Sequence, residues 1–399
     1  MPFPANSTGA EVRIGPRPLG LHLATAALSW TGAALPGGAL LGALSKSDPI
    51  SDAGTMARSA QARFDRLLNG INAYQVHPYR RQLQEPPSIW STAGMRLLDY
   101  GTPGNTRGIP LLIVPSLINR HYILDLKANQ SLVRYLAERG FRPFLVAWDD
   151  FGRTAKYVTV DDCIGGKLEA ALGMVRLVSG QAPIVIGYCL GGTLGAGLVA
   201  RRSKDVAGFV SLAAPWDFHA GSDGIGPAAR FAADALEPVI EALGSLPVDA
   251  IQSLFYTLDP FLVIEKFLKF ADMDALSPQA EAFVAIEDWL NDGFPLPGPI
   301  ARTLLSKWYG ENAPALGNWH IEGRRVDLAD LSIPSLVVVP AKDRIVPPES
   351  ARAMARQIPA AEVLEIEYGH VGLIASQRAP QIVWPRLADW LQKAAGVSR

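Results

Sequence analysis

One cysteine stands between glycines, a setting that favours chemistry over packing. Cys189 lies within "GYCLGG" at 187–192, directly after an apolar run. This matches the G-x-S-x-G pattern of a nucleophile on a sharp strand-to-helix turn, with a thiol in place of the hydroxyl. Side chains two positions before and after the nucleophile would collide across that turn. A third glycine lets the new helix pack close to the sheet, so the pattern explains three elbow glycines, Gly187, Gly191 and Gly192.

A nucleophile of this kind needs a base and an orienting acid, which follow it in the chain in the order acid, then base. Asp343 in "VVVPAKDRIVPP" follows a late apolar run, and His370 in "EIEYGHVGL" follows the last one. We predict a Cys189–Asp343–His370 triad. Asp217, after "SLAAPW", is the competing acid, because some enzymes of this type carry their carboxylate after the strand that follows the elbow. The helix that begins after Cys189 should favour its thiolate.

The loop after "LLIVP" should complete the site. An oxyanion is stabilised by two backbone N–H groups, one from the residue after the nucleophile and one from this earlier loop. We therefore expect Leu190 to supply one donor and Ser116 or Leu117 the other. Tyr122 and Asp125, further along the same loop, are expected to shape the pocket mouth.

Composition excludes several other classes of function. The formal net charge is −1, so nothing calls for a nucleic-acid partner. The two cysteines have no metal-type spacing and form no disulfide framework, which predicts a reducing compartment, no metal and no cofactor. Cys163 lies in a predicted helix with only acidic neighbours at 161–162, and we interpret it as structural.

Apolar runs that alternate with helical patterns must position these residues. Strands are predicted around 110–117, 143–148, 182–189, 206–215, 334–341 and 361–369, with helices between them and a last helix at 381–395. Such alternation predicts a parallel sheet covered on both faces. We therefore predict the α/β fold class: an α/β-hydrolase fold with a mostly parallel central sheet flanked by helices and an inserted helical cap.

The chain divides into three expected parts. Residues 1–90 form an N-terminal apolar and helical segment, and residues 91–215 with 334–399 form the α/β-hydrolase core. Residues 216–333 are apolar, aromatic and helix-like, and a structureless loop of that length is improbable, so they should form a helical cap that buries the thiol.

The N-terminal apolar segment has three possible roles. Residues 18–44 carry no Asp, Glu, Lys or Arg, yet are rich in Ala and Gly and interrupted by "LPGG" at 35–38. A helix that docks on protein or on an apolar surface is favoured over a membrane-spanning helix or a cleaved signal. We expect this segment to attach the chain to a granule or membrane surface.

Several motifs, in the same order, resemble those of polyhydroxyalkanoate synthases. These are the segment "PLLIVPSLINRHYILDLKANQ", the box "GYCLGGTL", and "DRIVPPESA" and "YGHVGL"; the resemblance covers roughly residues 90 to 395. It implies that Cys189, Asp343 and His370 are catalytic and that 3-hydroxyacyl-CoA is the substrate. The segment "LDPFLVIEKFLKFADMD" is most similar to the shorter synthase subunits, which implies a homodimer or a second subunit. Arg344 stands where family members usually have His.

Thiol chemistry by itself also fits acyl transfer. A thiol that attacks an acyl-CoA exchanges one thioester for another, so the acyl group stays activated for transfer to a hydroxyl. We expect an acyltransferase that polymerises 3-hydroxyacyl-CoA into polyhydroxyalkanoate and releases CoA, located in the cytoplasm and associated with polymer granules. The alternative is a cysteine hydrolase, either an acyl-thioesterase or an intracellular polyester depolymerase, since the same triad can use water. A non-catalytic protein that coats granules is the third interpretation.

Overall fold

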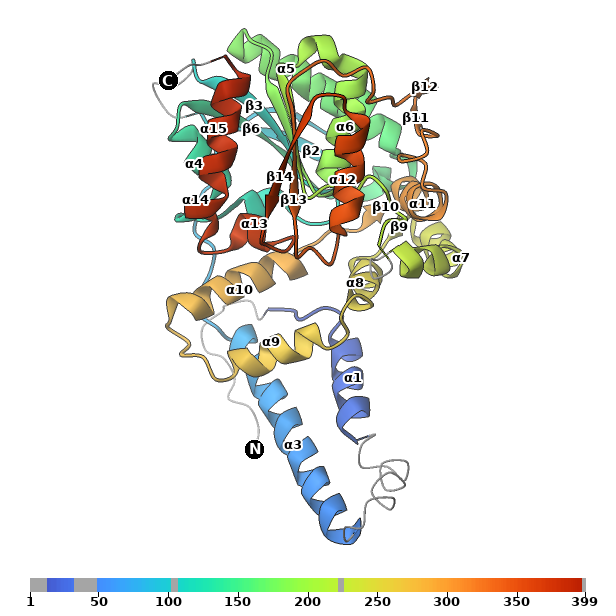
Figure 1. Cartoon of the computed structure of the whole chain (residues 1–399). Coiled ribbons are helices and arrows are strands. Elements are labelled where there is room, and N and C mark those ends of the chain that lie inside the picture. Colours follow the sequence, from blue (N-terminus) through green and yellow to red (C-terminus); the bar gives the residue numbers. More distant parts are fainter. Residues whose placement is uncertain (1–12, 32–48, 102–106, 222–225, 397–399) are drawn as a thin grey trace. The chain divides into compact units, whose positions relative to one another are not determined.

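The computed structural model describes residues 13–31, 49–101, 107–221 and 226–396. The described residues fall into two compact units, one from residues 1–80 and 259–291, the other from residues 81–258 and 292–399. Figure 1 shows the elements of both.

The larger unit is built on an eight-stranded sheet with the order β1-β2-β6-β3-β7-β8-β13-β14. The two pairs β1–β2 and β2–β6 are antiparallel, and all the later neighbours are parallel. The strands are β1 (Ser88–Thr92), β2 (Met95–Asp99), β3 (Ile109–Val114), β6 (Phe141–Trp148), β7 (Ile184–Tyr188), β8 (Gly208–Leu212), β13 (Ser335–Pro340) and β14 (Ala361–Ile366). The expected mostly parallel sheet is therefore confirmed.

The central strands are buried on both faces, as their continuous apolar sequences predict. In Figure 1, α4 (Leu132–Ala137) and α15 (Trp384–Ala394) lie on one side of the sheet, and α6 (Leu190–Arg202) and α12 (Pro348–Gln357) lie on the other. Local sequence fixes the ends of several helices: Ser131 Oγ caps α4 by accepting from the Arg134 N–H, and Gly180 ends α5 (Glu169–Ser179) in the left-handed conformation. The shorter α13 (Gly372–Ala375) and α14 (Ala379–Ile382) precede α15.

Short elements connect the parts of the sheet. They are η2 (His121–Leu124), β4 (Asp125–Lys127), β5 (Gln130–Ser131), η3 (Gly152–Tyr157), the π-helix η4 (Asp162–Leu168) and η5 (Ser203–Asp205).

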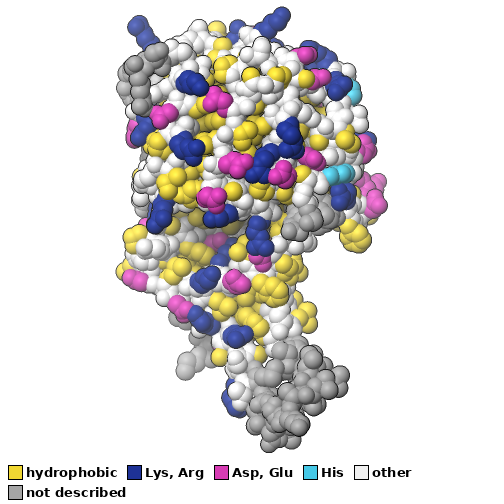
Figure 2. All heavy atoms as spheres, viewed as in Figure 1, with side chains coloured by type: hydrophobic (Ala, Val, Ile, Leu, Met, Phe, Trp, Pro, Cys, Tyr) yellow, Lys and Arg dark blue, Asp and Glu magenta, His cyan; other side chains and the backbone are white. Residues whose placement is uncertain are grey.

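On the face shown in Figure 2, the described Lys and Arg side chains are interspersed with Asp and Glu.

The chain between β8 and β13 is mainly helical, as the sequence predicts. In the larger unit it forms α7 (Gly226–Leu243), β9 (Ser245–Leu246), α8 (Val248–Tyr256), β10 (Leu296–Pro297), α11 (Gly298–Arg302), the π-helix η6 (Thr303–Gly310), β11 (His320–Ile321) and β12 (Arg324–Arg325). Because these elements interrupt the sheet between two neighbouring strands, they are an insertion in the α/β core.

The smaller unit consists of α1 (Leu19–Thr31), α3 (Pro49–Gln75), α9 (Leu262–Phe270) and α10 (Pro278–Asn291). Its core contains Leu67, Ile71 and Phe267, and Phe270 stacks on Phe283 with ring centroids 4.3 Å apart. This division differs from the expected parts, since residues 259–291 were assigned to the cap but group with the N-terminal helices.

Part of the N-terminal apolar segment forms α1, and this helix packs on protein. Ala26 is fully buried in the core of the smaller unit, and Leu23 packs against that core, while Leu28 is exposed. The "LPGG" sequence at 35–38 lies outside the described residues. Among the residues that are described, no helix has the length and apolar character needed to cross a membrane.

Candidate active site

Cys189 stands on the turn between β7 and α6. Its backbone has φ +55° and ψ −133°, a left-handed conformation that residues other than glycine rarely adopt. Two hydrogen bonds hold the turn: the Cys189 N–H donates to the Leu212 carbonyl at 2.9 Å, and the Gly192 N–H donates to the Cys189 carbonyl at 2.8 Å. The side chain is half-buried, so the strained turn presents the thiol at the carboxyl edge of the sheet.

The three glycines around Cys189 are required by close contacts. A Cβ at Gly187 would lie 2.3 Å from the Gly192 Cα, so the collision across the turn is with the backbone at the start of α6 and not with a side chain at 191. A Cβ at Gly191 would instead lie 2.0 Å from the Val114 carbonyl oxygen, so this glycine admits the end of β3. At Gly192 the obstacle is Ala214 Cβ at 2.4 Å, beyond the end of β8.

Asp343 and His370 meet after β13 and β14, as neighbouring parallel strands require. His370 Nδ1 lies 2.7 Å from Asp343 Oδ2, and both side chains are buried. The other carboxylate oxygen, Asp343 Oδ1, accepts from the backbone N–H groups of Ile345 and Val346, both at 2.9 Å. The carboxylate is thus held from two sides, and it fixes the Nδ1–H tautomer of the histidine.

The pKa of His370 depends on the Cys189 thiol. Burial alone would lower the pKa of His370, because it disfavours the charged imidazolium. The charges of Cys189 and Asp343, together with hydrogen bonds to both, act in the opposite direction and hold the pKa of His370 well above its ordinary value. Since Asp343 occupies Nδ1, Nε2 is the nitrogen left for the Cys189 sulfur. His370 thus lies between the Asp343 carboxylate and the Cys189 sulfur.

Asp217, the competing acid, is engaged elsewhere. Its Oδ1 accepts from the Asn312 side-chain amide at 2.8 Å and from the His219 N–H at 3.0 Å. The geometry therefore pairs His370 with Asp343.

The loop after β3 lies against the elbow. The Val114 and Pro115 carbonyl oxygens come so close to Gly191 that this position accommodates only hydrogen. Leu190 is the first residue of α6, so its N–H has no partner within the helix. Ser116 Oγ accepts from the Ile118 N–H at 3.2 Å, so the Ile118 N–H is engaged within the loop. The N–H groups of Ser116 and Leu117 both stay candidates for the second donor.

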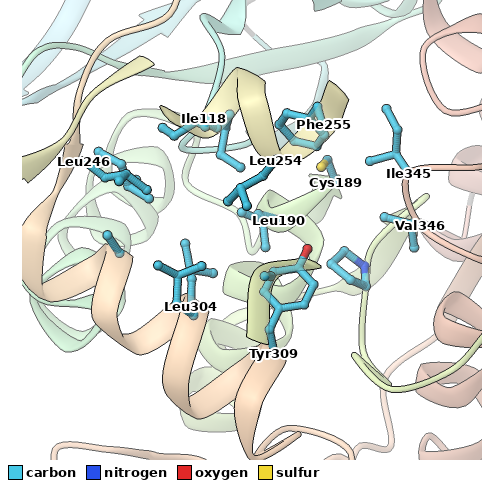
Figure 3. A pocket seen from close by; sticks show the side chains of 16 residues that line it. Ile118, Cys189, Leu190, Leu246, Leu254, Phe255, Leu304, Tyr309, Ile345 and Val346 are labelled. Atoms are coloured by element: carbon cyan, nitrogen blue, oxygen red, sulfur yellow. The ribbon is translucent and has the colours of Figure 1, made fainter. Parts of the chain in front are cut away.

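An apolar pocket opens beside the thiol (Figure 3). Its empty volume is about 600 Å³ with the open mouth included. Ile118, Leu190, Leu254, Phe255 and Leu304 are among the lining residues, which come from the β3 loop, the elbow, α8 and η6. Elements of the insertion thus form much of the wall around Cys189.

Two expectations for the β3 loop are wrong. Neither Tyr122 nor Asp125 is among the residues that line the pocket. Asp125 is fully buried and accepts hydrogen bonds from the Tyr100 hydroxyl at 3.0 Å, Ser131 Oγ at 2.6 Å and Arg134 Nε at 2.7 Å. A buried carboxylate needs such partners, and these hold it in a structural network away from the pocket.

Cys163 lies in η4, has no exposed surface and packs in the apolar core. Burial raises the pKa of its thiol to about 12. Within the described ranges, no group of three or more His, Cys, Asp or Glu side chains is placed to hold a metal ion.

Two aromatic residues of the site were not singled out from the sequence. Tyr188, inside the "GYCLGG" motif, is buried; its hydroxyl donates to the His370 carbonyl at 3.1 Å, and the two rings lie 5.4 Å apart. Tyr309 lines the pocket. The motif offered a signal for Tyr188, whereas Tyr309 lies in an ordinary apolar helical stretch.

The model of the α/β-hydrolase fold family matches residues 109–376. The chain belongs to this family, and the sheet order, the elbow and the insertion described above are those of an α/β-hydrolase core.

Curated relatives are more specific. The chain is 32% identical over 310 residues to the poly(3-hydroxyalkanoate) polymerase subunit PhaC of Haloferax mediterranei, covering 76% of this chain and 62% of that protein. It is 26% identical over 313 residues to the protein of the same name from Allochromatium vinosum, covering 77% of this chain and 88% of that one. These matches confirm the resemblance noted from the motifs.

Among solved structures, a monoacylglycerol lipase of Paleococcus ferrophilus matches with 18% identity and a TM-score of 0.49, over 75% of this chain and 99% of that one.

Proposed function

We propose that this chain is an acyltransferase that polymerises 3-hydroxyacyl groups from CoA thioesters into polyhydroxyalkanoate. The observation that carries the proposal is the position of His370. Its Nδ1 is hydrogen-bonded to Asp343, its pKa is raised by the Cys189 thiol, and this thiol lines an apolar pocket. The similarity to poly(3-hydroxyalkanoate) polymerase subunits supports the substrate class.

The first half of the proposed reaction loads the enzyme. The Cys189 thiolate attacks the thioester carbonyl, and a bond forms between Sγ and the carbonyl carbon. The oxyanion of the tetrahedral intermediate accepts hydrogen bonds from the Leu190 N–H and from the N–H of Ser116 or Leu117. The bond to the CoA sulfur then breaks, and His370 gives its Nε2 proton to the departing thiolate, so CoA leaves as the thiol.

The second half extends the polymer. A hydroxyl, at the end of a growing chain or on a second monomer, attacks the acyl carbon of the Cys189 thioester. His370 takes the hydroxyl proton, the new ester bond forms, and the thiolate is released beside the imidazolium. Throughout, Asp343 orients His370 and stabilises its positive charge. An apolar, poorly hydrated pocket favours the hydroxyl over water as acceptor.

The test is an end-product assay on the purified full-length chain with 3-hydroxybutyryl-CoA. We expect CoA release to be accompanied by insoluble polyester, measured as turbidity and by chromatography of the methanolysed pellet. Release of CoA with an equal amount of free 3-hydroxybutyrate and no pellet would contradict the proposal and identify a hydrolase. Release of no CoA by the chain, alone or with a second synthase subunit added, would contradict both enzymatic assignments.

A further inference from the structure

Tyr309 is held firmly where the insertion reaches the catalytic thiol. It lies in the π-helix η6, a geometry found frequently at functional sites. Its ring packs edge-on against Phe218, with centroids 4.9 Å apart and planes at 87°. His219 Nε2 lies 2.9 Å from the Tyr309 carbonyl oxygen, to which it donates. These contacts fix both the backbone and the ring, so the direction of the hydroxyl is set by the fold.

That hydroxyl points into the pocket, toward the side on which Cys189 lies (Figure 3). The remaining side chains that line the pocket are those of Ile, Leu, Val, Ala, Pro and Phe residues, so Tyr309 and the thiol are its two polar side-chain groups. Within the part of the chain that the structure describes, no hydrogen bond of the Tyr309 hydroxyl is found. Tyr309 is half-buried, so water can reach its hydroxyl in the open pocket. When a ligand fills the pocket and displaces this water, the hydroxyl needs a partner on the ligand.

The acyl group of the proposed substrate carries two polar groups. One is the thioester carbonyl, whose oxygen is accounted for by the backbone N–H groups at the elbow and the β3 loop. The other is the hydroxyl on the third carbon, two bonds beyond the carbonyl carbon that Cys189 attacks. Once the acyl group is in the apolar pocket, this hydroxyl also needs a partner.

We propose that Tyr309 recognises the 3-hydroxyl of the acyl group and so distinguishes 3-hydroxyacyl-CoA from simple acyl-CoA. The inference rests on the proposed function and goes beyond it, because it assigns a specificity-determining contact to one side chain of the insertion. A site that hydrogen-bonds a substrate hydroxyl rejects an analogue without it, since its own polar group is then left unpaired.

The charge state of Tyr309 agrees with this role. Burial and the nearby Cys189 charge both raise the pKa of its phenol well above the ordinary value. The phenol is therefore neutral over the usual range of assay pH and retains the proton that it donates.

The experiment compares two substrates in the wild type and in Tyr309→Phe. Both 3-hydroxybutyryl-CoA and butyryl-CoA have the same chain length, and only the first carries the 3-hydroxyl. Rapid mixing at low substrate concentration measures CoA release in the first turnover. The quantity compared is the apparent second-order rate constant, which is the rate of that release divided by the substrate concentration. We expect Tyr309→Phe to lose about tenfold with 3-hydroxybutyryl-CoA, the value of one hydrogen bond, and to be unchanged with butyryl-CoA.

A matched control is Tyr157→Phe, which removes the hydroxyl of a tyrosine that is 69% exposed and lies outside the pocket lining. It should leave both rates unchanged. Equal losses of Tyr309→Phe on both substrates would overturn the inference, because the residue would then act on the thioester or on the fold. Unchanged rates on both substrates would overturn it as well. If the wild type releases CoA from neither substrate, the proposed function itself fails, and the inference fails with it.

Discussion

The two cysteines occupy opposite kinds of environment. Cys189 is half-buried on a strained turn, is coupled to His370 and opens onto a pocket. Cys163 is fully buried among apolar side chains in η4, where burial raises the pKa of its thiol. The same side chain is thus placed once for reaction and once for packing. The difference lies in the neighbours: a base, a carboxylate behind it and space for an acyl group.

Replacing each thiol in turn should give the largest contrast. Cys189→Ala removes the nucleophile, so we expect CoA release from 3-hydroxybutyryl-CoA to fall by more than about a thousandfold. Cys163→Ala leaves a small cavity, so activity should remain within about threefold of wild type while the unfolding free energy falls by about 1 kcal/mol. Chromatography, which detects CoA without a thiol reagent, measures the activity of both variants. Denaturant titration measures their unfolding free energies. Normal turnover in Cys189→Ala would contradict the assignment of Cys189 as the nucleophile.

The next largest effect concerns the carboxylate behind the base. Asp343→Asn should keep the fold but deprive His370 of its charged partner, with a loss of turnover on the order of 10³ to 10⁴, as in other triads. The matched control is Asp217→Asn, which changes a carboxylate bonded to Asn312 and should alter turnover only a few-fold. If Asp217→Asn is the inactive variant and Asp343→Asn is not, the acid has been assigned to the wrong strand.

Titration of His370 gives a smaller but more specific effect. The pKa of His370 is raised in part by the Cys189 charge, so a neutral residue at 189 must move its midpoint to lower pH. NMR of protein with labelled histidine should show this shift between wild type and Cys189→Ala. Cys163→Ala should leave the midpoint unchanged. An unshifted His370 in Cys189→Ala would mean that the thiol and the imidazole are not coupled.

Much of the fold follows from local sequence patterns. The central parallel strands β7, β8 and β13 are mainly apolar runs bounded by helical segments, and burial on both faces leaves such runs few alternatives. The last strand, β14, lies at the edge of the sheet and carries exposed Glu362 and Glu365. The hairpin of β1 and β2 was not predicted, because β1 is short, mostly exposed and carries Ser and Thr at its ends. The grouping of α9 with α3 in the smaller unit depends on contacts between segments nearly 200 residues apart, which no local pattern reports.

The site residues also separate into those that local sequence predicts and those that depend on tertiary contacts. Cys189, Asp343 and His370 occupy strand ends, and a parallel sheet brings strand ends together, so the sequence could predict that Asp343 and His370 meet. Tyr309 enters the pocket through the packing of the π-helix against Phe218 and His219. Asp125 was predicted at the pocket mouth because it is a carboxylate in the loop that follows β3. Its burial depends on hydrogen bonds from Arg134 and Tyr100, and these tertiary contacts cannot be seen in the sequence.

The central claim is that the acyl group is carried on Cys189, and peptide mapping by mass spectrometry tests it most directly. Butyryl-CoA has no hydroxyl with which to extend a chain, so the acyl-enzyme should accumulate when the full-length protein is mixed with it and quenched in acid. The account predicts a butyryl group on the peptide that contains Cys189 and an unmodified peptide for Cys163. A butyryl group on Cys163 or on a hydroxyl side chain, or CoA released with no acylated peptide, would contradict it.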